Sequence, residues 1–371
     1  MVEVDWPPQV CEVVNNKAVY VNRCADRLIA HPKYAHFRTL PVVEQSMKDI
    51  TSRKSSVSPK IPADPVPVVK YIDEIRINKD ALSSSQLLRL EEIHTRNYKA
   101  FDGDLTGGYN HKAGRFNSSF CFKDSNKPPP YKVWAPQYNR ECSELLQAKC
   151  DQLEAQGVLA DPNKHGIQIQ HVSPIFIQQK GRARHKLLND CTLDEIRFIS
   201  CQNVLNENIK AIPSLSTSHI KIFKFLARWK FHIFADMLNS YFQIPMQKNL
   251  WGYLAINTPY RGLRVMTRSG QGLLNSDVFL DQLLMKVLGD ELAEGICEVA
   301  RDDLQVGGNT VEEVIRNWDR VLSKINKCNL KISAGKVRIL LNDSEVYGFR
   351  VRDGHVLPSQ HSISNLGETK N

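Results

Sequence analysis

The sequence lacks two features that would direct it to or through a membrane. No run approaches the 18 or so consecutive apolar residues that a membrane span needs. The N-terminus has no basic segment followed by an apolar one, the pattern of a secretory signal. Its 371 residues are 42% hydrophobic and 24% charged, as in ordinary globular proteins. We therefore expect an intracellular protein with no membrane partner, and the sequence does not separate cytoplasm from nucleus.

Metal-binding cysteine pairs and internal repeats are also missing. The nine cysteines are an odd number, and none of them forms a Cys-X-X-Cys pair or a Cys/His cluster with zinc spacing. No repeat of 20–50 residues is visible. These absences exclude a zinc finger and a solenoid. They also predict reduced thiols, none of which stands out as a nucleophile.

Positive charge, by contrast, is abundant and concentrated. The chain has 49 Lys and Arg against 40 Asp and Glu, a formal charge of +9. Residues 164–235 alone hold 11 Lys and Arg against 4 Asp and Glu. Such a local surplus suggests a polyanionic partner such as nucleic acid, with a solvated basic face as the alternative.

Hydrophobic periodicity predicts alternating helices and strands after a Ser/Lys/Pro-rich linker at 51–70. The predicted helices are 81–94, 141–157, 276–292 and 311–328. The predicted strands are 172–178, 229–236, 296–300, 304–306 and 345–351. In 229–236, Trp229, Phe231, Ile233 and Ala235 are expected on one face and Asp236 on the other. This mixture predicts an α+β domain.

The sharpest chemical feature is Asp302-Asp303, which follows Arg301 between two apolar strands in a hairpin pattern. Alone the pair is weak evidence, because turns favour Asp and such pairs arise by chance. Asp236 ends an earlier strand, and a third carboxylate there could complete a site for two Mg²⁺ ions. Two such ions support phosphoryl transfer.

These residues stand in segments that resemble the reverse transcriptase domain of an LTR-retrotransposon or retroviral Pol polyprotein. The resemblance runs from about residue 85 to 360 and is carried by ECSELLQAKCDQLEAQGVLAD, VSPIFIQQKG, IRFISCQNVLN, ADMLNSYFQIPM, SGQGLLNSDVF, ARDDLQVGG, LKISAGKVRI and EVYGFRV. SGQGLLNSDVF is similar to the family's PQGxxNSPxxF, and ARDD to its YxDD. It implies a right-hand polymerase fingers–palm fold, with an antiparallel palm sheet backed by helices and the thumb largely absent.

The resemblance also implies site residues. Asp236, Asp302, Asp303 and the Met237 backbone carbonyl would hold two Mg²⁺ ions, with Mn²⁺ as a possible substitute. Tyr241 would lie beneath the incoming sugar and exclude a 2′-hydroxyl. The alternative for Tyr241 is a core aromatic.

Other positions would contact the nucleotide and the primer. Lys180 and Arg197 would contact the triphosphate, where fixed positive charge is required. Lys336 would protonate the leaving pyrophosphate. Lys180 is followed by several interchangeable basic residues, and Lys336 could be a solvated turn residue. Two further pairs complete the implied set: Gln271 and Gly272 at the nucleotide and template, and Tyr347 and Gly348 at the primer grip.

The sequence departs from the family pattern at several positions. Ala300 and Arg301 replace the first residues of YxDD, and Arg301 could pair with the carboxylates or point at primer phosphate. Gly270 replaces the proline of PQG and loosens that turn. Cys201 and Asn203 stand where the family has an Asp and an Arg, so we expect a fingers ion pair to be missing.

We therefore predict an N-terminal segment of unknown role (1–60), a linker and lead-in segment (61–130) and reverse transcriptase-like fingers and palm (131–371). The implied activity is RNA-directed DNA polymerisation on an RNA or DNA template with a primer and dNTPs. Most of the thumb, RNase H and integrase would belong to a longer product. The alternatives are a truncated remnant that binds nucleic acid without catalysis, and an RNA-dependent RNA polymerase, against which Tyr241 argues.

Overall fold

The computed structural model describes residues 72–123, 128, 138–213 and 219–341, and the backbone of five further strands. The chain divides into two compact units, Met1–Val69 and Lys70–Asn371. In the first unit, β1 (Cys11–Val14) and β2 (Lys17–Tyr20) pair antiparallel. All other described elements belong to the second unit. Among the helices of the described ranges, none is both long and apolar enough to cross a bilayer.

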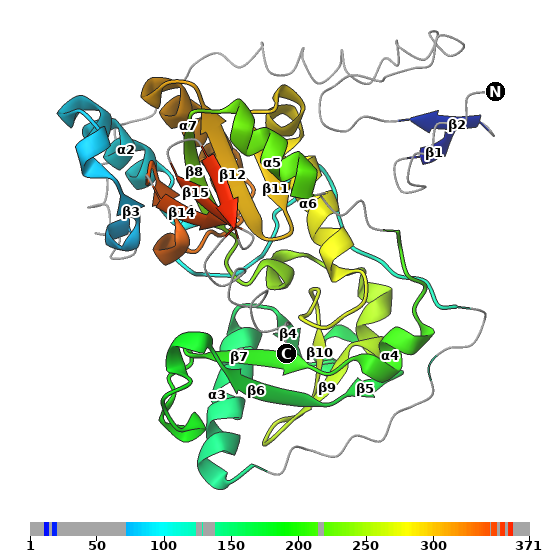
Figure 1. The fold of residues 1–371 in the computed structure, drawn as a ribbon. Helices are drawn as coiled ribbons and strands as arrows, with labels where there is room; N and C mark the ends of the chain where they lie inside the picture. The colour runs from blue at the N-terminus through cyan, green and yellow to red at the C-terminus, as the bar shows by residue number, and fades with distance from the viewer. Residues whose placement is uncertain are drawn as a thin grey trace, which may run out of the picture. The chain divides into compact units, whose positions relative to one another are not determined.

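A five-stranded sheet lies in the upper part of the second unit as drawn in Figure 1, with α2 (Ser84–Arg96), α5 (His219–Arg228) and α7 (Val311–Lys327) beside it. Its order is β11 (Cys297–Ala300), β12 (Asp303–Gly308), β8 (Phe231–Asp236), β13 (Arg338–Ile339) and β3 (Arg76–Ile77). Neighbouring strands from β11 to β13 pair antiparallel, as expected, whereas β3 pairs with β13 in parallel. A strand from the predicted lead-in segment therefore completes one edge of the sheet.

Side-chain alternation on β8 buries both faces of this sheet. Ile233 and Ala235 point into the main core, which includes Trp318 of α7 (Val311–Lys327). Phe234 points the other way and packs with Leu226 of α5 (His219–Arg228). The prediction that Trp229 continues the strand face is wrong. Trp229 precedes the strand, and its ring nitrogen donates to the Gly295 carbonyl oxygen at 3.0 Å.

Two capped helices pack together on the main-core side. α2 (Ser84–Arg96) begins with the capping box of Ser83 and Gln86, and Thr310 caps α7. The buried Trp318 ring donates from Nε1 to His94 Nε2 at 3.1 Å, which joins the two helices. Burial lowers the pKa of His94 to about 4, so its ring is a neutral acceptor at pH 7. The described part of the lead-in segment is thus built into the core.

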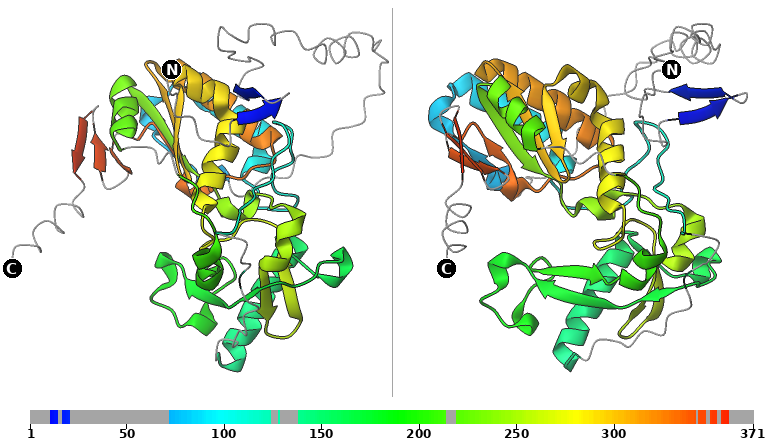
Figure 2. Two further views of the ribbon diagram at one scale, coloured as in Figure 1. Left: turned by 90° about the vertical axis from the view of Figure 1, so that its right-hand side faces the viewer. Right: turned by 45° about the vertical axis from the view of Figure 1, so that its right-hand side comes forward.

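Two smaller sheets accompany α3 (Arg140–Ala155) (Figure 2). One has the order β4 (Leu159–Ala160), β10 (Gly262–Met266), β9 (Ala255–Thr258) and β5 (Val172–Ser173). The other pairs β6 (Ile175–Gln179) with β7 (Ile196–Ser200). The single strand predicted at 172–178 is therefore wrong. Pro174 carries no N–H for a ladder, and the chain changes sheets there.

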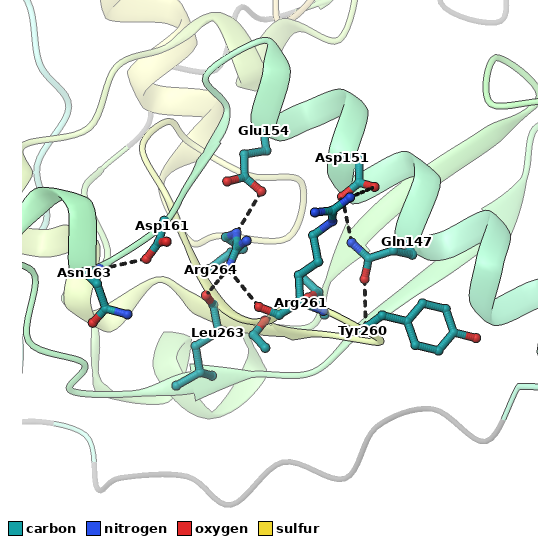
Figure 3. A network of polar contacts seen from close by, with 11 residues as sticks. Gln147, Asp151, Glu154, Asp161, Asn163, Tyr260, Arg261, Leu263 and Arg264 are labelled. Carbon is teal, nitrogen blue, oxygen red and sulfur yellow. Dashed lines mark hydrogen bonds and ion pairs between the residues drawn. The ribbon is translucent and has the colours of Figure 1, made fainter.

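Ion pairs fasten the β9–β10 hairpin to α3 (Figure 3). Arg264 Nε donates to Glu154 Oε2 at 2.8 Å, and Arg261 Nε lies 2.7 Å from Asp151 Oδ1. The Tyr260 backbone N–H donates to Gln147 Oε1 at 2.9 Å. We call these residues the α3–hairpin network.

The remaining elements follow the predictions in part. α4 (Asn203–Asn208) follows β7, and α6 (Ser276–Glu294) agrees with the predicted helix but has non-helical backbone at Leu288. The single strand predicted at 345–351 is wrong. β14 (Asp343–Val346) and β15 (Phe349–Arg352) pair antiparallel, and β16 (His355–Pro358) completes a three-stranded sheet.

Candidate active site

Two of the three predicted carboxylates lie directly opposite each other at the end of the five-stranded sheet. In the β8–β12 pairing, Asp303 is the partner of Asp236, so both side chains lie on one face. Asp303 is the first residue of β12, and the hairpin turn consists of Arg301 and Asp302. Arg301 has a φ of +58°, which makes the chain reverse within these residues.

The third carboxylate residue, Asp302, is joined through its backbone to Met237, the residue directly after β8. The Asp302 carbonyl oxygen accepts a hydrogen bond from the Met237 N–H at 2.8 Å. The Asp236 carbonyl oxygen accepts from the Ser333 N–H at 2.8 Å. The turn that carries Lys336 is thereby placed beside Asp236, although the two residues are 100 positions apart in the sequence.

Lys336 forms an ion pair with Asp236. Its Nζ lies 2.7 Å from Asp236 Oδ2, and the lysine side chain is 61% exposed while the aspartate side chain is 14% exposed. Burial raises the pKa of Asp236 above its ordinary value, with a further increase from Asp302 and a partial decrease from Lys336. The carboxylate is therefore held in an environment that disfavours its charge.

A pocket of about 250 Å³ opens at this point of the sheet. Its lining combines two acidic with three basic side chains, together with Ala235 and Gly335: Asp236, Asp303, Arg76, Lys336 and Arg338. Arg338 also lies over the ring of Phe234, 5.6 Å from its centroid. Such a mixture suits a ligand that carries phosphates together with cations.

In the described ranges, no group of three or more Asp, Glu, His or Cys side chains is arranged as a metal site. The donor set nevertheless fits Mg²⁺ or Mn²⁺, because these hard ions prefer carboxylate oxygens. Lys336 places a positive charge on one of those oxygens. Its exposed side chain can withdraw without unfolding any element.

Tyr241 is fixed at its hydroxyl group. It lies in a 3-10 turn, Ser240–Gln243, and donates a hydrogen bond to Asp277 Oδ1 in the first turn of α6. Burial raises the pKa of Tyr241, and Asp277 and Asp302 raise it further. The ring is thus within electrostatic reach of the hairpin turn, and its hydroxyl remains protonated at neutral pH.

The predicted triphosphate contacts belong to the β6–β7 pair, with Arg197 on β7 opposite Gln178. Lys180 directly follows β6, and its N–H donates to the Glu195 carbonyl oxygen at 2.7 Å. Burial lowers the pKa of Lys180, and the nearby charges of Arg182, Arg197 and Lys336 lower it further. Lys180 therefore lies within electrostatic reach of Arg197 and Lys336, and an anion bound near it would offset their mutual repulsion.

Gln271 and Gly272 are exposed residues in the turn before α6. Gly272 has a φ of +97°, and a Cβ atom there would lie 3.1 Å from the Ser200 carbonyl oxygen, so glycine is required. Asn206 of α4 holds this turn: its Nδ2 donates to the Gly272 carbonyl oxygen at 2.7 Å and its Oδ1 accepts from the Leu274 N–H at 2.8 Å. Tyr347 and Gly348 lie outside the described residues.

Sequence reasoning missed three residues that hold these parts in place. They are Asp277, Asn206 and Arg268. Arg268 is 5% exposed and donates to the carbonyl oxygens of Leu105, Phe242 and Gln156 at 2.6–2.9 Å. A signal existed for Asp277, which stands where PQGxxNSPxxF has its second proline. Nothing local in the sequence indicates the partners of Asn206 and Arg268.

Cys201 and Asn203 cannot form the ion pair of the family's Asp and Arg, because neither a thiol nor an amide side chain supplies the required charge. A different pair stabilises the segment after β6: Lys186 Nζ lies 2.6 Å from Glu195 Oε1. Arg301 is exposed, and its charge lowers the pKa of both Asp281 and Tyr241. The positive charge of Arg301 thus lies within electrostatic reach of Tyr241 and of α6.

Comparisons with known proteins agree with this architecture. Among solved structures, the chain is similar to the foamy viral protease–reverse transcriptase dRH in complex with double-stranded DNA (TM-score 0.65, 18% identity, 87% of this chain and 52% of that chain). It is also similar to the foamy viral protease–reverse transcriptase with double-stranded DNA (0.63, 18%, 86% and 60%) and with an RNA/DNA hybrid (0.62, 17%, 87% and 40%). The chain thus spans about half the length of these proteins.

No curated protein sequence matches the chain. A family model described as reverse transcriptase (RNA-dependent DNA polymerase) matches residues 180–369, slightly more than half of the sequence. The structural neighbours share the α+β polymerase fold with it. The chain belongs to the reverse transcriptase (RNA-dependent DNA polymerase) family.

Proposed function

We propose that this chain adds dNTPs to the 3′-hydroxyl of a primer under the direction of an RNA or DNA template. The observation that carries this proposal is the pairing of Asp236 with Asp303 across β8 and β12, beside the turn residue Asp302. Three carboxylates at one end of a sheet match the needs of two-metal phosphoryl transfer. The family membership and the similarity to structures with DNA and RNA/DNA hybrid support the choice of substrates.

The residues that would hold two Mg²⁺ ions are Asp236, Asp302, Asp303 and the Met237 backbone carbonyl, with Mn²⁺ as a substitute. Such ions, when bound, stabilise the charge on the attacking and leaving oxygens. Lys336 would compete with a metal ion for Asp236 Oδ2, so this ion pair has to open when that oxygen becomes a ligand. Its ammonium group is then free to move toward the leaving pyrophosphate.

The chain's own residues would then act on the nucleotide. Lys180 and Arg197 hold the triphosphate oxygens with fixed positive charge. The 3′-hydroxyl oxygen bonds to the α-phosphorus, the bond from that phosphorus to the bridging oxygen breaks, and pyrophosphate departs. The hydroxyl proton passes to solvent, while Lys336 donates a proton to pyrophosphate.

Tyr241 and its neighbours would select the sugar of the incoming nucleotide. Its ring would lie beneath the sugar and clash with a 2′-hydroxyl, so dNTPs are preferred to rNTPs. Gln271 and Gly272, both exposed beside the start of α6, would border the nucleotide and the template. Tyr347 and Gly348 would act at the primer grip.

We further propose that the chain derives from a retrotransposon Pol polyprotein and acts inside the cell. The N-terminal segment (1–60), the lead-in segment (61–130) and the fingers and palm (131–371) are its proposed parts. The thumb, RNase H and integrase would be supplied by a longer product.

Primer extension on an RNA template tests the proposal directly. The full chain is incubated with Mg²⁺ or Mn²⁺ and dNTPs, beside an Asp302→Asn/Asp303→Asn variant. Asp319→Asn is the matched control, because Asp319 pairs with Arg96 of α2 and does not line the pocket beside Asp236. We expect incorporation by the wild type and the control, and none by the double variant.

The ion pair of Lys336 with Asp236 favours a second candidate, a chain that binds nucleic acid without polymerising. Basic residues between 164 and 235 would still attract RNA or DNA, with affinity that falls steeply as salt rises. Binding without incorporation at any Mg²⁺ or Mn²⁺ concentration would favour this candidate. Incorporation that depends on Asp302 and Asp303 would reject it.

A further inference from the structure

The hydrogen bond from Tyr241 to Asp277 joins two elements that border the candidate nucleotide site. Tyr241 belongs to the turn after β8, and Asp277 belongs to the first turn of α6. The acceptor is a carboxylate oxygen, so the bond is charge-assisted and stronger than one between neutral groups. The ring of Tyr241 is thereby fixed at its hydroxyl as well as at its backbone.

A side chain fixed at both ends cannot change its rotamer without breaking the bond to Asp277. An untethered tyrosine could turn away from a bulky sugar, whereas a tethered ring would present the same surface to every nucleotide. The acceptor is specific to this chain's version of the motif. The family pattern PQGxxNSPxxF has a proline at the position of Asp277, and a proline side chain accepts no hydrogen bond.

The charged groups of the hairpin turn also act electrostatically on the same hydroxyl. Asp302 raises the pKa of Tyr241, and Arg301 lowers it, so both residues are within electrostatic reach of the phenol. Arg301 also lowers the pKa of Asp281, one turn after Asp277 on α6. The tether thus joins the start of α6 to the segment after β8, and the same segment contacts the hairpin turn through the hydrogen bond from the Met237 N–H to the Asp302 carbonyl oxygen.

We propose that Asp277 is a positioning residue that holds the Tyr241 ring against the sugar of the incoming nucleotide and so determines discrimination between dNTPs and rNTPs. This inference rests on the proposed polymerase function. It predicts that the bond between the two side chains, and not the charge of Asp277 alone, maintains selectivity.

The test compares Asp277→Ala, Asp277→Asn, Tyr241→Phe and the double variant Tyr241→Phe/Asp277→Ala. Single-nucleotide incorporation gives kcat/KM for a dNTP and for its rNTP, and their ratio is the selectivity. We expect Asp277→Ala and Tyr241→Phe each to lower the ratio about tenfold, or about 1.4 kcal/mol. The double variant should lose no more than either single one, because both remove the same bond.

Two variants separate positioning from a general structural role. Asp277→Asn keeps an oxygen acceptor and should restore most of the selectivity. Asp281→Asn removes a carboxylate one turn later on α6 and should leave the ratio unchanged. Equal losses for dNTP and rNTP in Asp277→Ala, or an unchanged ratio, would overturn the proposal.

Nucleotide binding keeps the inference testable if extension fails. With a dideoxy-terminated primer and Ca²⁺ in place of Mg²⁺, the stability of the complex with dNTP or rNTP is measured without chemistry. Selective binding without extension would count against the polymerase proposal while leaving the Asp277 comparison intact. A wild-type chain that binds dNTP and rNTP equally, or neither, would overturn the role of Asp277.

Discussion

Carboxylates have opposite surroundings in the α3–hairpin network and in the candidate active site. In the network, Asp151 and Glu154 each face an arginine at 2.7–2.8 Å (Figure 3). At the end of β8, Asp236 is partly buried, and the negative charge of Asp302 raises its pKa. Its ion-pair partner, Lys336, is mostly exposed. The network balances its charges and stabilises the fold. In the site, burial and the charge of Asp302 disfavour the ionised form of Asp236. Such unfavourable charges are common where a bound ligand of opposite charge neutralises them.

The largest effect should come from Asp236→Asn. We expect polymerase activity to fall about a thousandfold or more, because a neutral amide is a poor ligand for Mg²⁺. The melting temperature should not fall, since the substitution removes a charge that burial disfavours. It also loses only one ion pair to an exposed lysine, worth about 1 kcal/mol or less.

Primer extension and thermal denaturation measure these two quantities. Asp151→Asn is the matched variant in the network, and the opposite pattern is expected: a lower melting temperature with activity within a few-fold of the wild type. If Asp236→Asn retained its activity, the assignment of the site to β8 would be wrong.

The second prediction concerns Lys336, the ion-pair partner of Asp236. Lys336→Ala should lower the Mg²⁺ concentration that gives half-maximal activity, because the metal no longer competes with an ammonium group. Turnover should nevertheless fall by about a hundredfold, the usual contribution of a general acid. Lys336→Arg is the control: it preserves the positive charge but does not give up a proton at neutral pH.

A Mg²⁺ titration of primer extension gives both quantities. An unchanged half-saturation in Lys336→Ala would show that the ion pair does not limit metal binding. Unchanged turnover would instead remove Lys336 from the proposed chemistry.

How far the sequence anticipates this site depends on whether the signal is local. The Asp-Asp pair, its hairpin and the end of β8 follow from alternation and turn chemistry over a few residues, and the structure places them together. The contact of Lys336 with Asp236 spans 100 positions, and local periodicity carries no information about it. The family resemblance, not the spacing, singled out Lys336, and no sequence pattern indicated its ion pair.

The fold shows the same limit at its sheet edges. Helices α2, α3 and α7 follow from apolar periodicity and caps. β3 is two residues long and pairs in parallel with β13. The paired residues Arg76 and Arg338 are 262 positions apart in the sequence. Strands this short have no periodicity of their own. Their partners are chosen by tertiary packing, as with β5 and β6 on either side of Pro174.

In the α3–hairpin network, Arg264→Ala should lower the stability of the fold. The Arg264 side chain is 13% exposed and bonds Glu154 as well as the carbonyl oxygens of Arg261 and Leu263. Its loss leaves Glu154 without this partner and should cost about 2 kcal/mol of the free energy of unfolding. Activity per folded molecule should change little.

Chemical denaturation measures the loss, and Arg261→Ala is the matched control. The Arg261 side chain is 56% exposed, so removing its pair with Asp151 should cost less than about 1 kcal/mol. Equal losses for the two arginines would mean that burial does not set the strength of this network.

The smallest expected effect is the pH dependence of stability. Its sign is opposite for Asp281 on α6 and for Glu195 before β7. Burial raises the pKa of Asp281 to about 6, with a contribution from Asp277 and partial offsets from Arg301 and Lys221. In an unfolded chain the pKa of Asp is about 4. The folded protein therefore loses stability as pH rises from about 4 through 6, and Asp281→Asn avoids this loss.

Thermal denaturation between pH 4 and 8 tests the sign. Asp281→Asn should match the wild type near pH 4 and melt at a higher temperature above pH 6, by a margin that partial exposure of the carboxyl keeps small. Glu195 is the counterpart, because hydrogen bonds from Lys186 and the Thr192 N–H lower its pKa to about 2. Its stabilisation is present at neutral pH and lost as pH falls toward 2, so Glu195→Gln should melt lower than the wild type at pH 7. A constant difference between Asp281→Asn and the wild type at every pH would show that Asp281 does not carry an unfavourable charge.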